Sequence, residues 1–95
     1  MSDEKIVITV VGVDRPGIVA MVANILAENN INIEDMRSTI LQSGIPVFTM
    51  IMIADMSKSK ISYDELKNIL KKKEEETGVT LIALKEEIFK FLHRV

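Results

Sequence analysis

The chain has 95 residues, of which 47% are hydrophobic, and this length and composition fit one domain with its own packed core. A net charge of −2, with three phenylalanines, one tyrosine and no tryptophan, argues against nucleic-acid binding, which uses basic patches and stacked aromatics. The absence of cysteine excludes disulfides and thiolate metal sites and is typical of the reducing cytoplasm, and no apolar run is long enough for a membrane span.

Residues 6–13 are almost all apolar and β-branched, which predicts a first strand that is covered on both faces. Apolar residues then recur at helical spacing, which predicts a helix over about 17–28. The stretch between them is Asp14-Arg15-Pro16-Gly17-Ile18.

This stretch has the residues of a strand-to-helix turn. Asp14 is a candidate N-cap, Pro16 has no N–H to lose in a first helical turn, and Gly17 lets another group approach the backbone. Free N–H groups at such a helix start attract a carboxylate or a phosphate. The same residues also form a plain turn without any ligand, and both interpretations stay open at this point.

The middle of the chain predicts a hairpin. Asn29 and Asn30 are suited to a left-handed helix end, and a second strand runs over 31–41 with a bulge near 34–36. A third strand, apolar on both faces, follows over 47–54, and this pattern indicates a central place in the sheet.

The next segment carries the clearest helix signals. Ser62 and Glu65 have the spacing of a capping box, so a second helix should start there and continue to about residue 76. Gly78 is suited to end that helix, and residues 79–84 form the fourth strand.

Residues 86–95 form a last amphipathic segment. Ile88, Phe91 and Leu92 share one side of a helical turn. A helix this short is not stable alone in water, so we expect it to dock on the open sheet face or on a partner subunit.

The element order is βαββαβ plus a short C-terminal helix. It predicts an α+β, ferredoxin-like sandwich with a four-stranded antiparallel sheet and two helices on one face. Since the first and third strands are apolar on both faces, we expect a homodimer or a larger even oligomer to cover the second face.

Three short stretches carry a resemblance to a known family. They are Asp14-Arg15-Pro16-Gly17-Ile18-Val19, Ile25-Leu26-Ala27 and Asn30-Ile31-Asn32-Ile33. Together they resemble the ACT domain, a small regulatory module that binds amino acids in metabolic enzymes and transcriptional regulators. The likeness covers about 5–84, so the chain looks like one of the stand-alone single-ACT-domain proteins of bacteria and archaea, with one domain over 1–95.

The resemblance implies a ligand site between two such domains. It assigns ligand contacts to Asp14 and Asn32, with space near the backbone of Gly17 and Ile18. Where serine-binding members have an amide, this chain has Asp14, and a carboxylate favours the ammonium group of a ligand. The candidate ligand-binding residues are Asp14, Arg15, Pro16, Gly17, Ile18, Asn32 and Ile33.

The resemblance therefore predicts a regulatory module that binds a small amino acid and signals to a metabolic enzyme or regulator. A ligand-free dimerisation module is the alternative, and an acylphosphatase-like hydrolase is a weaker one, because Arg15 stands beside Asp14, which would repel a phosphoryl group. We predict no catalytic residue, metal site or cofactor. His93, near the C-terminus, is the only histidine, and the acidic residues show no metal-ligand spacing.

Overall fold

The computed structural model describes residues 4–42 and 44–92, and these form four strands and three helices. His93 and the rest of 93–95, part of the predicted C-terminal segment, lie outside the described residues. The elements are β1 (Lys5–Val13), α1 (Ile18–Glu28), β2 (Asn32–Leu41), β3 (Val47–Asp55), α2 (Tyr63–Thr77), β4 (Thr80–Lys85) and α3 (Glu86–Leu92).

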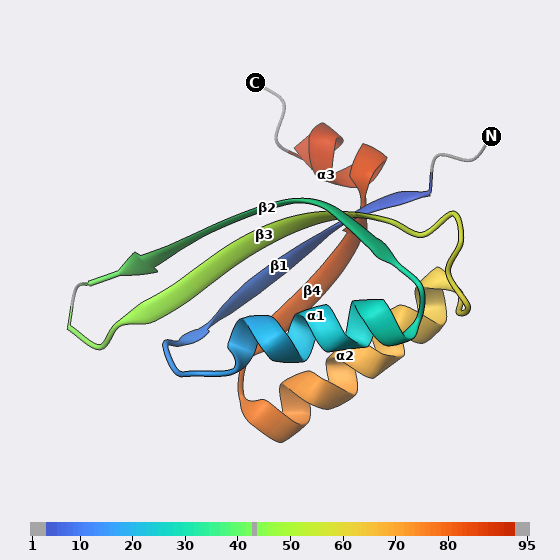
Figure 1. The fold of residues 1–95 in the computed structure, drawn as a ribbon. Helices are drawn as coiled ribbons and strands as arrows, with labels where there is room; N and C mark the ends of the chain where they lie inside the picture. The colour runs from blue at the N-terminus through green and yellow to red at the C-terminus, as the bar shows by residue number, and fades with distance from the viewer. Residues whose placement is uncertain (1–3, 43, 93–95) are drawn as a thin grey trace.

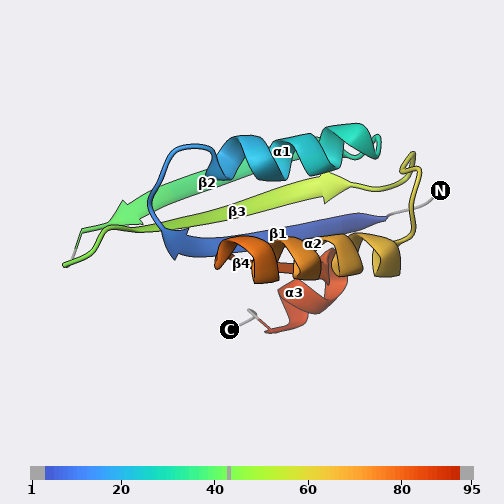
Figure 2. The same ribbon diagram turned by 90° about the horizontal axis from the view of Figure 1, so that it is seen from below.

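The four strands form one antiparallel sheet in the order β2-β3-β1-β4. α1 and α2 lie side by side on one face of this sheet, and α3 lies on the other (Figure 1). The strand order can be followed in Figure 2, where β2 and β4 are the edge strands. The predicted ferredoxin-like sandwich is therefore confirmed, with the first and third strands at its centre.

The core lies between the sheet and the helix pair. Ile8 and Val10 on β1 and Met50 and Met52 on β3 are buried there, because alternate residues of a strand point to the same face. The largest side chains that the helices contribute to this core, all fully buried, are Leu26, Leu66 and Leu70. Among the described residues, no helix has the length and apolar character that a membrane span requires.

Several predicted element boundaries are confirmed. The Ser62 side chain accepts a hydrogen bond from the Glu65 N–H, and the Glu65 carboxylate accepts one from the Ser62 N–H, so both halves of the capping box are present. Gly78 ends α2 at a φ of 78°. Asn30 adopts a φ of 59° after α1, and the pairing of β2 with β3 shifts between Ile33 and Asp35.

The start of α1 differs from the prediction. Asp14 does not cap the helix: its backbone N–H donates to the carbonyl of Pro46, 3.0 Å away in the β2–β3 loop. The N-cap is Gly17, at a φ of 93°, and no side chain caps this end. Pro16 consequently lies before the N-cap rather than in the first helical turn. The cause is a contact between residues distant in sequence, which local turn rules do not include.

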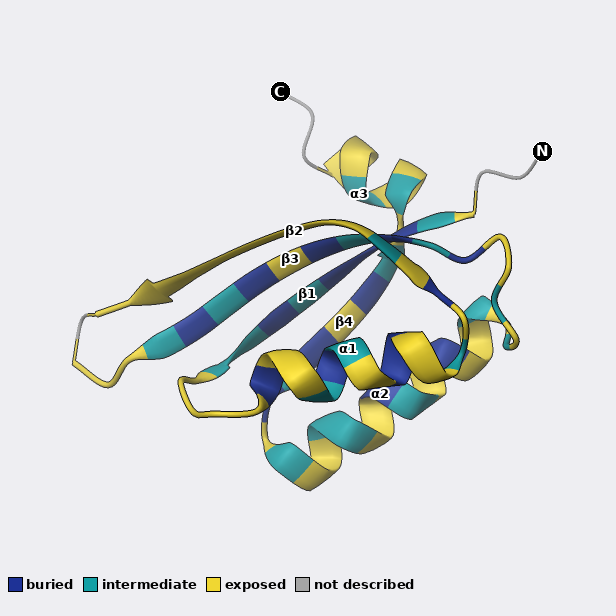
Figure 3. Ribbon diagram, viewed as in Figure 1, coloured by how far each residue is buried: buried dark blue, intermediate teal, exposed yellow. Residues whose placement is uncertain are grey.

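α3 docks on its own sheet, but not through the predicted stripe. It contacts β1 and β4, and Val7, which points away from the helix pair, is only 2% exposed beneath it. Phe89 and Glu86 are the half-buried residues of α3. The predicted stripe of Ile88, Phe91 and Leu92 is instead exposed, and Figure 3 shows how much of α3 and β2 faces solvent.

Candidate functional site

The turn between β1 and α1 places five of the predicted site residues together. Asp14, Arg15, Pro16 and Gly17 are exposed, whereas Ile18 is buried as the first residue of α1. The first turn of α1 contains no acidic side chain and has no side-chain cap. The start of α2 differs, because Ser62 caps it and two acidic residues lie in its first turn. The positive end of the α1 dipole is therefore left for another group.

Space beside this turn is open. A Cβ built on Gly17 would meet nothing within 4 Å, so the glycine is required by its backbone conformation and not by crowding. Another group lies close to the backbone at a different glycine, Gly12, where a Cβ would be 3.2 Å from a methyl carbon of Val79. A small molecule could thus reach the backbone at the start of α1 without displacing a neighbour.

Arg15 has a partner within the fold. Its Nη2 donates to the carbonyl of Thr77, 2.9 Å away, at the C-terminal end of α2. A cation at that end satisfies a carbonyl that has no partner inside the helix and complements the helix dipole. Arg15 therefore connects the turn to α2, although it lies among the predicted ligand contacts.

Asn32 and Ile33 lie at the other end of α1. The helix has 11 residues, so about 16 Å separates its two ends. Asn32 pairs with Asp55 at the end of β3, while Val13 pairs with Val47 at its start. One chain consequently does not bring Asn32 and the Asp14 turn together.

A small hollow of about 320 Å³ lies beside Asn32. Its lining residues come from the end of α1, the start of β2 and the loop after β3: Ala27, Asn30, Ile31, Asn32, Asp55, Ser57 and Lys58. Sequence reasoning missed Asp55 and Lys58 as neighbours of Asn32, because their proximity depends on the pairing of β2 with β3. The only signal in the sequence was the polar character of the loop after the third strand.

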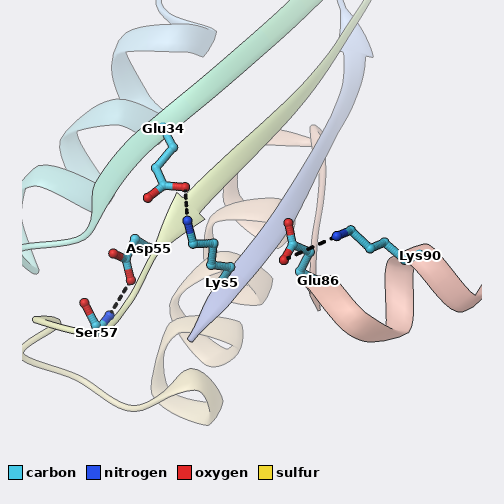
Figure 4. A network of polar contacts seen from close by, with 6 residues as sticks. All are labelled: Lys5, Glu34, Asp55, Ser57, Glu86 and Lys90. Carbon is cyan, nitrogen blue, oxygen red and sulfur yellow. Dashed lines mark hydrogen bonds and ion pairs between the residues drawn. The ribbon is translucent and has the colours of Figure 1, made fainter. Parts of the chain in front are cut away.

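Charged side chains beside this hollow form a network (Figure 4). Nζ of Lys5 donates to Oε1 of Glu34 at 2.6 Å, which joins β1 to β2 across β3. This hydrogen bond raises the pKa of Lys5 above its ordinary value. The backbone N–H of Ser57 donates to Asp55 at 2.9 Å and lowers the pKa of that carboxyl group. Asp55, which pairs directly with Asn32, is therefore a carboxylate at neutral pH.

A larger hollow of about 850 Å³ lies between the starts of β1, α2 and α3. None of the predicted site residues lines it. Its Tyr63 hydroxyl donates to the carbonyl of Ala83, and the ammonium groups of Lys67 and Lys85 lie 5.1 and 5.4 Å from the Tyr63 ring centre. Within 4–42 and 44–92, no cluster of histidine, cysteine, aspartate or glutamate side chains could hold a metal ion.

Comparisons with known proteins agree with this fold. A model of the ACT domain matches residues 4–83. A UPF0237 protein of Methanococcus maripaludis is 49% identical over 92 residues, which are 97% of this chain and 99% of that protein. An ACT domain protein from Streptococcus pneumoniae has a similar structure, with a TM-score of 0.75 and 34% identity over 90% of this chain and 93% of that one. The ligand-free regulatory subunit of aspartate kinase from Thermus thermophilus shares the fold, with a TM-score of 0.57 and 21% identity over 87% of this chain and 52% of that one.

Proposed function

Because this chain belongs to the ACT domain family, we propose that it is a stand-alone regulatory module that binds a small amino acid and signals to a metabolic enzyme or regulator in the cytoplasm. The observation that carries this proposal is the uncapped start of α1, next to an exposed carboxylate at Asp14. The module acts by binding, and no catalytic step is assigned to it.

An amino acid has two charges, and the two parts of the candidate site offer a partner for each. Its carboxylate fits the backbone N–H groups at the start of α1, where the helix dipole favours negative charge. Its ammonium group fits the carboxylate of Asp14 or the side-chain oxygen of Asn32.

A site that uses both residues requires two copies of the chain. β2 is an edge strand exposed along nearly its whole length, and on the side of the sheet that carries α1 its Met36 and Ile40 are 45% and 41% exposed. Antiparallel pairing of two β2 edges brings Asn32 of one chain to the sheet end where the turn of the other chain lies. The amino acid then binds at the boundary, between Asp14 of one copy and Asn32 of its partner.

Thermal-shift screening with the common amino acids identifies the ligand, because a ligand that binds the native state raises Tm with concentration. Calorimetry with the best hit then compares the wild type with Asp14→Ala and Asn32→Ala. Each variant should lose a charge-assisted hydrogen bond of about 1.5–3 kcal/mol, or roughly ten- to a hundredfold in affinity. Asn68→Ala, at an exposed position on α2, is the control and should bind like the wild type.

Mixing the two variants tests whether the site is shared. A dimer with one Asp14→Ala chain and one Asn32→Ala chain keeps one intact site and loses the other. Random mixing should therefore restore about a quarter of the sites, since a two-fold dimer has two equivalent ones. A site contained in one chain would regain nothing on mixing. Wild-type affinity in both single variants would place the site elsewhere.

A ligand-free interaction module is the second candidate, and the exposed apolar residues of the sheet face opposite α1 and α2 favour it. If no amino acid shifts the wild-type Tm, this candidate replaces the sensor. The hydrolase alternative is weaker, because the Arg15 guanidinium donates to Thr77 instead of standing over the start of α1. Release of phosphate from an acyl phosphate by the pure protein would support the hydrolase alternative.

A further inference from the structure

The two edges of the sheet differ in how their outward backbone groups are bonded. In an antiparallel sheet, alternate residues of an edge strand direct their N–H and C=O groups away from the neighbouring strand. On β4 these residues include Leu81 and Ala83, because each has a backbone group bonded to α2 and not to β1. The side chains of both are buried beneath α2, which runs along β4 (Figure 2).

Two side chains of α2 bond to these outward groups. The Leu81 N–H donates to Oε2 of Glu74 at 3.0 Å, and the Tyr63 hydroxyl donates to the carbonyl of Ala83 at 3.0 Å. A strand added to β4 would need the N–H and the C=O of both Leu81 and Ala83. One group of each residue is already occupied, so an added strand would have to displace the side chains of α2.

The helix presents Tyr63 and Glu74 on one side. Their separation in the sequence corresponds to three full turns and about 20° more, so the two side chains leave α2 in nearly the same direction. Leu70, which is fully buried in the core, lies on this side as well. A hydroxyl and a carboxylate that are half-buried beside the core require hydrogen-bond partners, and the edge of β4 supplies them.

The β2 edge has no such cover. β2 is exposed along nearly its whole length, and within the described part of the chain no side chain of α1 bonds to its backbone. The Met36 N–H donates to the carboxylate of Asp35, which belongs to the same strand. Charge adds to the difference, because the ammonium groups of Lys67 and Lys85 lie beside Tyr63 at the β4 edge. Lysines at an edge oppose the pairing of two such edges.

We propose that Tyr63 and Glu74 seal the β4 edge against a strand of another chain, so that strands can pair only at the β2 edge. The seal matters for assembly, because a dimer that pairs through β2 carries one β4 edge at each end. Pairing at both edges would repeat without closing and would produce an open-ended fibre. With β4 sealed, the chain has one pairing edge, and assembly through sheet edges stops at two copies.

The double variant Tyr63→Phe/Glu74→Ala tests the seal, because it removes the hydroxyl and the carboxylate but keeps an aromatic ring at position 63. Its mass by light scattering at high micromolar concentration should be at least about twice that of the wild type, since β4 edges can then pair. The control Asn68→Ala/Glu75→Ala removes an amide and a carboxylate from exposed positions of the same helix, and it should keep the wild-type mass. The comparison needs no amino acid, so its result is independent of the proposed ligand site.

Hydrogen exchange of single amides reports on the seal directly. In dilute Glu74→Ala, the Leu81 amide should exchange roughly tenfold faster than in the wild type, because its acceptor is lost. The Leu70 amide, inside α2, should keep its wild-type rate and so show that the helix is intact. In the concentrated double variant the Leu81 amide should be protected again, because the strand of another chain then accepts its hydrogen bond.

A folded double variant that keeps the wild-type mass at every concentration would overturn the proposal. An equal rise of mass in Asn68→Ala/Glu75→Ala would overturn it too, because loss of charge on α2 would then be the cause. Circular dichroism shows whether the double variant folds. If it does not, Tyr63→Phe alone decides: it should form heavier species at the highest concentration, and an unchanged mass would count against the seal.

Discussion

Gly17 determines the conformation of the candidate site at the scale of one residue. Its φ of 93° is a region that L side chains avoid, while the space around its Cβ position is open. Gly17→Ala should therefore lower the free energy of unfolding by about 1–2 kcal/mol through backbone strain alone. Equilibrium unfolding in urea measures this change as a lower midpoint with an unchanged m-value.

Gly44→Ala is the matched control for that substitution. Gly44 has a φ of 87° and equally open surroundings, but it lies in the β2–β3 loop. Both variants should lose similar stability, and only Gly17→Ala should also weaken amino-acid binding. A Gly17→Ala variant that unfolds at the wild-type midpoint would contradict the claim that a side chain at this position strains the backbone.

Single residues also show where sequence reasoning reaches its limit. Ser62 and Glu65 satisfy each other within one helical turn, so their spacing alone predicted the cap of α2. Asp14 is an equally good N-cap residue by type, but its backbone N–H donates to the carbonyl of Pro46, 32 positions later in the chain. A pairing of this kind follows from the contact of β1 with β3, which no local pattern contains.

At the scale of an element, α2 depends on its capping box. Ser62→Ala removes the acceptor for the Glu65 N–H and should cost about 1 kcal/mol. Ser62→Asp should retain most of the wild-type stability, because aspartate is an equally good N-cap residue. Thermal unfolding followed by circular dichroism compares the three proteins. Equal losses in both variants would show that Ser62 acts through something other than capping.

The elements themselves were largely predictable, and their contacts only in part. The apolar pattern of the first and third strands correctly indicated their central places, and the break at 34–36 correctly indicated the bulge between Ile33 and Asp35. The side on which α3 docks was not predictable, because its apolar residues Ile88, Phe89, Phe91 and Leu92 spread over nearly half of the helix circumference. The burial of Phe89 in preference to Ile88 and Leu92 depends on how α3 lies against β1 and β4, and that requires the tertiary structure.

At the scale of the whole molecule, the two parts of the candidate site could be named from the sequence but not placed. The family resemblance identified Asp14 and Asn32 as candidate ligand contacts. Only the fold shows that the length of α1 separates them and that Asp55 lies beside Asn32. The family resemblance implies a ligand site between two domains. The separation of Asp14 from Asn32 within one chain is a geometric reason to expect a site of that kind.

The assembly should also determine thermal stability. If the native state is a dimer or larger, dilution favours the unfolded chain by mass action, and Tm should rise by roughly 3–5 °C for each tenfold increase in protein concentration. Calorimetric scans over a hundredfold range of concentration measure this dependence. Met36→Lys, on the exposed β2 edge that pairs in the proposed dimer, should reduce the dependence, whereas Asn68→Lys should retain it. A wild-type Tm that stays constant over the whole range would mean that the chain folds as a monomer, with the apolar residues of β2 exposed to water.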